Sequence, residues 1–146
     1  MKTKTIMTAI LLLFSLISLA QKMEYKTIQD LEDGEKVSDI YTFDLKAKTL
    51  KIRFEDGDNE EYKIDYYTKK ENQEDEDIYG EGKGVKFTAY YIKIDDKQAT
   101  SMEKLKTLSY LMLMVPENQY SSKFHKILEV NYFGMMSSFY YSVTEN

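Results

Sequence analysis

Three short stretches between Tyr41 and Tyr66 alternate between apolar and polar residues, and this alternation constrains the fold more than any other feature of the chain. The apolar positions are Tyr41, Phe43 and Leu45, then Leu50, Ile52 and Phe54, and then Tyr62, Ile64 and Tyr66. A period of two places successive side chains on opposite faces of a strand. The pattern therefore predicts three successive strands, an antiparallel meander with one buried and one solvated face.

Further strand patterns lie on either side of this meander. Residues 21–28 alternate and predict a first strand or a loose arm, and residues 139–143 predict a last strand. Residues 127–133 fit a strand, whereas residues 124–128 also fit one face of a short helix. The polar run Lys69–Asp77 contains no apolar residue, so we expect an exposed connection there.

The longest strand pattern, Val85–Ile94, changes phase near its middle. One face would carry Val85, Phe87, Ala89 and Tyr91, and the other would carry Ile92 and Ile94. Such a switch predicts a bulge or a bend near Tyr90 and Tyr91, which would let the strand serve two parts of a curved sheet.

The segment from about 100 to 115 supports two interpretations. Its apolar residues recur at helical spacing, and Thr100 with Glu103 fits a capping box. Against a helix, Tyr110–Val115 is a continuous apolar run, and Gln98–Glu103 is where a hairpin partner of the preceding strand is expected. We favour two strands, and Pro116 would end the element in either case.

Together these patterns predict an all-β fold, a small antiparallel meander that closes into a barrel or packs as a two-layer sheet. The alternative is an α+β fold with one helix at about 100–115. Nothing marks a second domain, so we expect residues 21–146 to form a single β-rich domain.

Residues 1–20 predict a cleaved signal peptide. Lys2 and Lys4 form a basic start, residues 6–19 are mostly apolar, and Ser18-Leu19-Ala20 supplies small residues before a cut after Ala20. The apolar run is shorter than the roughly 20 residues that a membrane span needs. We therefore expect a secreted or periplasmic protein without stable membrane insertion after cleavage.

The composition argues against several kinds of function. The chain has no Cys, which removes thiol redox chemistry, cysteine zinc sites and cysteine hydrolases. Its net charge is −5, or −7 without Lys2 and Lys4, and Arg53 is its only Arg. An acidic chain with one Arg lacks the basic surface that phosphate backbones attract, so we expect no nucleic-acid partner.

Residues that could carry catalysis or bind metal are few. His125 is the only His, which leaves too few ligands for a zinc site and no local context for a catalytic triad. The alternating carboxylates Asp56, Asp58 and Glu60 suit calcium, but such residues also make good turns. The run Gly80–Gly84 does not match a phosphate loop. We predict no catalytic residue, no metal and no cofactor.

The bend predicted in Val85–Ile94 is the best candidate for a binding site. A pocket opening there would be lined by Tyr66, Phe87, Tyr91 and Met112. We expect an exported, non-enzymatic module that holds a small apolar ligand in a barrel or under a curved sheet. The alternative is a protein partner docked on a sheet face, which a filled core and exposed tyrosines would favour. A small hydrolase is the third, less favoured class.

Overall fold

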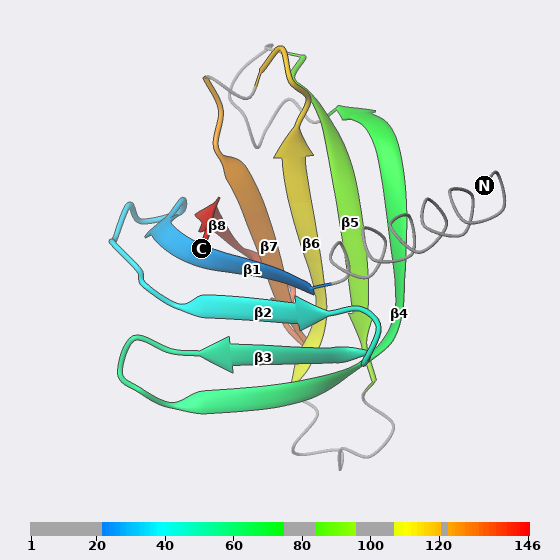
Figure 1. Ribbon diagram of the computed structural model, residues 1–146. Helices are drawn as coiled ribbons and strands as arrows, with labels where there is room; N and C mark the ends of the chain where they lie inside the picture. The colour runs from blue at the N-terminus through cyan, green and yellow to red at the C-terminus, as the bar shows by residue number, and fades with distance from the viewer. Residues whose placement is uncertain (1–21, 75–83, 96–106, 121–122) are drawn as a thin grey trace, which may run out of the picture.

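The computed structural model describes residues 22–74, 84–95, 107–120 and 123–146 (Figure 1). Within these ranges the chain forms eight strands and no helix. The strands are β1 (Lys22–Asp30), β2 (Ile40–Asp44), β3 (Thr49–Arg53), β4 (Asn59–Glu74), β5 (Lys86–Ile94), β6 (Leu108–Pro116), β7 (Lys126–Tyr132) and β8 (Phe139–Glu145). None of the described residues belongs to a helix with the length and hydropathy that a membrane crossing requires.

The strands form a closed antiparallel barrel in simple up-and-down order. Each strand pairs with the next one along the chain, and β8 closes the barrel against β1 through the pairs Tyr25–Glu145 and Lys26–Thr144. The sequence prediction of an all-β meander is confirmed, and the structure shows that the meander closes into a barrel.

The barrel has two sets of strands that cross each other. In Figure 1, β1, β2, β3 and the first part of β4 lie across the view, whereas the rest of β4 and strands β5 to β7 stand upright. Strand β4 belongs to both sets, and its pairing with β5 shifts by one residue between Ile64 and Tyr66. A bulge bends a strand, so this shift is the physical reason that β4 can turn the corner.

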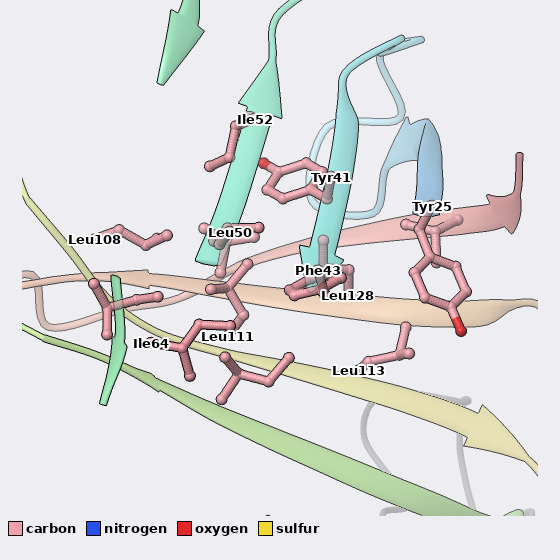
Figure 2. Close-up of a cluster of buried hydrophobic side chains, with 14 residues drawn as sticks. Tyr25, Tyr41, Phe43, Leu50, Ile52, Ile64, Leu108, Leu111, Leu113 and Leu128 are labelled. Carbon is pink, nitrogen blue, oxygen red and sulfur yellow. The ribbon is translucent and has the colours of Figure 1, made fainter. Parts of the chain in front are cut away.

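The barrel interior is filled by side chains. Tyr25, Tyr41 and Phe43 enter from β1 and β2, and Figure 2 shows them with the aliphatic side chains of the opposite strands. The buried residues of this inner core are Tyr25, Tyr41, Phe43, Leu50, Ile52, Ile64, Ile92, Ile94, Leu108, Leu111, Leu113, Leu128, Val130 and Val143. Burial of this much apolar surface is the main favourable contribution to folding in a chain without disulfides.

A second apolar cluster lies on the outside of the barrel, over β5, β6 and β7. Its buried members, the outer cluster, are Val85, Phe87, Ala89, Met114 and Ile127. The β5–β6 register pairs Ala89 with Met114, and the β6–β7 register pairs Met114 with Ile127, so these side chains form one row across three strands. Tyr120 and Phe124, from the connection between β6 and β7, pack against this cluster.

The outer cluster explains the phase switch of β5 and corrects the predicted bulge. From Phe87 to Lys93 the pairing of β5 with β6 is regular, so no bulge lies at Tyr90 and Tyr91. The irregular positions are in β4, between Ile64 and Tyr66 and around Asn72, which has a positive φ of 54°. The apolar pattern of β5 changes face because its first half contributes to the outer cluster and its second half to the inner core.

The favoured strand at Tyr110–Val115 is confirmed, because Leu108–Pro116 is a strand, and this excludes the alternative helix at about 100–115 over its second half. Three further predictions about local structure are wrong. The partner of β5 is β6, while Gln98–Glu103 lies outside the described residues. The run Lys69–Glu74 is not a loop, because it pairs with β5 despite its polar sequence. Within the meander, Tyr66 is exposed, since the bulge before it turns its side chain away from the core.

Candidate functional site

The four residues proposed from the sequence as a ligand site line one hollow on the outside of the barrel. Tyr66 comes from β4, Phe87 and Tyr91 from β5, and Met112 from β6. The hollow, called the outer groove here, has a volume of about 530 Å³ and is also lined by Thr68, Lys70, Gln73, Glu74 and Ala89. The structure thus brings the four residues together, but outside the barrel and not in its interior.

The groove exists because small residues lie between large ones. Thr68, Tyr91 and Met112 form one cross-strand row, and Lys70 and Ala89 belong to the next. Ala89 and Thr68 have short side chains, whereas Tyr91, Phe87 and Met112 rise around them. Since a strand advances by about 3.3 Å per residue, the floor from Phe87 to Tyr91 is about 13 Å long.

One end of the groove is formed by stacked tyrosines. The rings of Tyr66 and Tyr91 are 6.2 Å apart and tilted by 37°, and the rings of Tyr91 and Tyr110 are 5.2 Å apart and tilted by 31°. Offset aromatic pairs at such separations attract each other beyond the area they bury. Burial, followed by the nearby Tyr66 and Glu129, raises the pKa of Tyr91 above its usual value, so this phenol stays neutral at physiological pH.

The tyrosine row ends at a buried carboxylate. Glu129 of β7 is 6% exposed and accepts hydrogen bonds from the Tyr110 hydroxyl at 2.8 Å and from the Ser138 hydroxyl at 2.6 Å. Asn131 donates in turn to Ser138 at 3.2 Å. Burial first, together with the charge of Glu129, raises the pKa of Tyr110 to about 12. This network holds Tyr110 in place behind Tyr91 and so fixes the aromatic end of the groove.

The charged lining residues of the groove, Lys70 and Glu74, both come from β4. Neither makes an ion pair with any described residue, although Glu74 stands opposite Lys86 in the β4–β5 register. Lys69 and Glu71, whose ion pair has 2.6 Å between Nζ and Oε1, belong to the same strand but do not line the groove. The groove therefore has an apolar β5–β6 side and a polar β4 side.

The other candidates from the sequence do not form a comparable site. His125 is exposed in a separate hollow, where the lining residue Glu145 forms an ion pair with Lys126. Over the described ranges, no group of three or more His, Cys, Asp or Glu side chains is placed to hold a metal ion, and the acidic β3–β4 turn is within those ranges. Residues 80–83 of the glycine run lie outside them.

The sequence prediction missed half of the groove. Thr68, Lys70 and Gln73 were not among the proposed residues, because β4 was expected to end before Lys69. Ala89 could have been found, since a small residue between Phe87 and Tyr91 on one strand face leaves space above it. Glu129 also gives a sequence signal, because it is a single charge inside the apolar run of β7.

No family model, no curated protein and no solved structure matches this chain. The functional argument therefore depends on the groove alone.

Proposed function

We propose that this chain is an exported, non-enzymatic protein that binds a small, mainly apolar ligand in the outer groove. The observation that carries the proposal is the meeting of Tyr66, Phe87, Tyr91 and Met112 around one hollow of about 530 Å³. Small-molecule sites typically measure about 300–1,000 Å³ and combine apolar walls with a few polar groups. The barrel interior holds the buried side chains of the inner core, whereas this hollow opens on the outside of the barrel, which supports an outer binding surface.

A non-enzymatic role fits the groups that line the groove. No His or Cys is among its lining residues, and its charged groups are Lys70 and Glu74 on the β4 side. Lys70 is exposed, and Glu74 stands opposite Lys86 in the β4–β5 register. Such groups can orient a ligand, whereas a nucleophile paired with a positioned base is what covalent chemistry would require.

Export is supported by residues 1–20, which have the basic start, apolar middle and small-residue end of a signal peptide. Amino-terminal sequencing of protein recovered from the medium or periplasm should begin at Gln21. Protein that stays in the cytoplasm with Met1 or Lys2 at its start would contradict the export part of the proposal without affecting the groove.

Filling the groove tests the binding part directly. Ala89→Met would place a long side chain over the floor, and Ala47→Met makes the same substitution in the exposed β2–β3 turn as a control. The neutral fluorescent probe N-phenyl-naphthylamine should bind the unchanged protein and the Ala47→Met variant, and its affinity for Ala89→Met should fall at least about tenfold. Thr68→Met, on the exposed wall, provides a second filling variant if Ala89→Met does not fold.

Two outcomes of the probe experiment would contradict the proposal. Equal probe binding by all folded variants would show that the groove is not the site, and absence of binding by the unchanged protein would refute the proposal. Native mass spectrometry of the protein from its producing cells adds an independent measurement. A retained small molecule that disappears in Ala89→Met would support the groove.

A protein partner is the second candidate function, and two observations favour it. Buried side chains occupy the core, and Tyr66, in the groove, and Tyr67, next to it in the sequence, are 48% and 47% exposed. Exposed aromatic side chains are common anchors in protein interfaces. Under this alternative, Tyr67→Ser would abolish capture of a specific protein from the producing cells while leaving probe binding unchanged.

A further inference from the structure

We propose that residues 66–70 of β4, called the free edge here, pair in antiparallel register with the free edge of a second copy of this chain. The proposal concerns how two barrels meet, and it does not depend on ligand binding in the outer groove. It is carried by an unpaired strand edge and by the order of the side chains along that edge.

Strand β4 extends beyond its neighbour on one side. It pairs with β3 only from Asn59 to Lys63, whereas its pairing with β5 continues to Glu74. On the β3 side, the last backbone hydrogen bond is donated by the Ile64 N–H to the Lys48 carbonyl, at 2.9 Å. In Figure 1 the upright part of β4 stands at one side of the barrel, and no described strand other than β5 pairs with it there.

The free edge presents backbone groups that another strand can bond. The Lys86 carbonyl accepts a hydrogen bond from the residue after β6, so even-numbered residues of β5 face β6 and odd-numbered ones face β4. The register sets the even-numbered Ile92 opposite Tyr67, and Tyr90 stands opposite Lys69 in the same way. The N–H and C=O groups of Tyr67 and Lys69 therefore point away from β5, where no described residue bonds to them. Such unpaired groups are a template for an added strand.

The order of residues along the free edge suits a second copy in antiparallel orientation. A two-fold axis at Thr68 sets Thr68 against its own copy, Tyr67 against Lys69 and Tyr66 against Lys70. The two Tyr67–Lys69 pairs exchange about four backbone hydrogen bonds between the chains. A Thr–Thr pair and an ammonium group beside a tyrosine ring are both favourable cross-strand contacts.

Lysine on an exposed edge usually prevents edge-to-edge pairing, and only this register avoids that conflict along the whole free edge. A slide of two residues in one direction would set Lys69 against Lys69 of the second copy. A slide in the other direction would set Lys69 against Asp65, whose carbonyl at the bulge already accepts a hydrogen bond from Lys48 Nζ at 3.2 Å. Beyond Lys70 the regular edge ends, because Asn72 has a φ of 54° and the pairing with β5 shifts there.

Pairing of the free edges brings the two outer grooves together. Tyr66, Thr68 and Lys70 line the groove as well as belonging to the free edge. In the dimer, Lys70 of the second copy lies beside Tyr66 of the first groove, so each copy contributes a residue to the rim of the other groove. The two grooves then lie on one continuous sheet face.

A single cysteine at the two-fold axis tests the register, because the chain has no cysteine of its own. Thr68 would meet its own copy with about 4.5 Å between Cα atoms, which is within the range of a disulfide bond. Thr68→Cys should therefore form a disulfide-linked dimer in a glutathione redox buffer. Lys70→Cys is the matched control, since it is exposed on the same strand face. Its own copy would be about 13 Å away along the strands, so we expect roughly tenfold less linked dimer.

Sedimentation velocity of the protein isolated from its producing cells tests the pairing without a cysteine. We expect the unchanged protein to convert from monomer to dimer as its concentration rises. Lys69→Pro removes an N–H from the free edge and leaves the β5 ladder intact, so it should remain monomeric. Lys69→Gln keeps that N–H and should still form the dimer.

Three results would overturn the proposal: a monomer at every concentration, a dimer that persists in Lys69→Pro, or equal linkage of the two cysteine variants. Linkage of Lys70→Cys alone would show a different register and would also overturn it. The proposed function has a separate readout, because binding of the neutral naphthylamine probe and its loss in Ala89→Met can be measured on a monomer.

Discussion

Tyr41 provides a sharp test of how the inner core is stabilised. Its side chain is 2% exposed, and the β2–β3 register places it opposite Ile52, beside which Figure 2 shows its ring. No described residue hydrogen-bonds to its hydroxyl group, although the surrounding side chains bury it. Burial raises the pKa of Tyr41 well above its usual value, as expected for a phenol in apolar surroundings.

Removing this hydroxyl should stabilise the protein. A buried polar group without a partner costs about 1–3 kcal/mol of stability, because it gives up its hydrogen bonds to water. Tyr41→Phe keeps the ring and removes the group, so we expect the free energy of unfolding to rise by about 1–2 kcal/mol. For a domain of this size the gain corresponds to a rise in Tm of roughly 3–6 °C.

Tyr110→Phe is the matched control with the opposite sign. The Tyr110 hydroxyl donates to Glu129 at 2.8 Å, and its loss would remove a partner from a buried carboxylate. Hydrogen bonds to charged groups contribute about 1.5–3 kcal/mol, so we expect a loss of stability in that range. Urea unfolding followed by circular dichroism would measure both variants. A Tyr41→Phe variant less stable than the unchanged protein would refute the reasoning, because it would show that the hydroxyl is hydrogen-bonded in the core.

Four more predictions follow from the barrel. Alkali should destabilise the protein, because burial raises the pKa of Tyr25 from 10.0 to about 12 and the unfolded chain therefore ionises first. A contribution of roughly 2–3 kcal/mol that is present below pH 10 should be lost as the pH of urea melts rises to 12. Leu111→Ala, a fully buried change in the inner core, should cost about 2–5 kcal/mol in the same assay, and a smaller loss would mean that the core collapses around the gap. Asn72→Val should cost about 1–2 kcal/mol because its φ is 54°, whereas Asn72→Gly should be tolerated; equal stability of the two variants would contradict this. Chelator should leave the thermal melt unchanged, and a large upward shift with calcium would show that the acidic β3–β4 turn binds it.

The strands could be predicted from the sequence where one face is buried and the other solvated. Tyr41, Phe43, Leu50 and Ile52 alternate with polar residues and all enter the inner core. No local sequence pattern predicts the closure of the barrel. Closure depends on the pairing of β1 with β8, which are far apart in the sequence, so the sequence was equally compatible with a barrel and with a two-layer sheet.

The errors came from strands that break this simple pattern. Lys69–Glu74 has no apolar residue, yet it is a strand because its backbone pairs with β5. The first half of β5 buries side chains in the outer cluster, and its second half buries side chains in the inner core. The resulting change of apolar face looks, in the sequence, like the pattern of a bulge. The sequence placed Phe87 and Tyr91 on one face of the strand, as the structure does, but the position of that face outside the barrel could not be inferred without the strand register.

The pairing of β1 with β8 has a consequence for how the chain reaches its folded state. The residues joined by this ladder, such as Tyr25 and Glu145, are separated by almost the whole described chain. Long-range pairing of this kind slows folding, because the entropy of closing a long loop is lost before the contacts form. The barrel cannot close until β8 has left the ribosome, so a partly synthesised chain keeps strands β1 and β7 unpaired on one side. Completion of the last strand is therefore the step that allows the barrel to close.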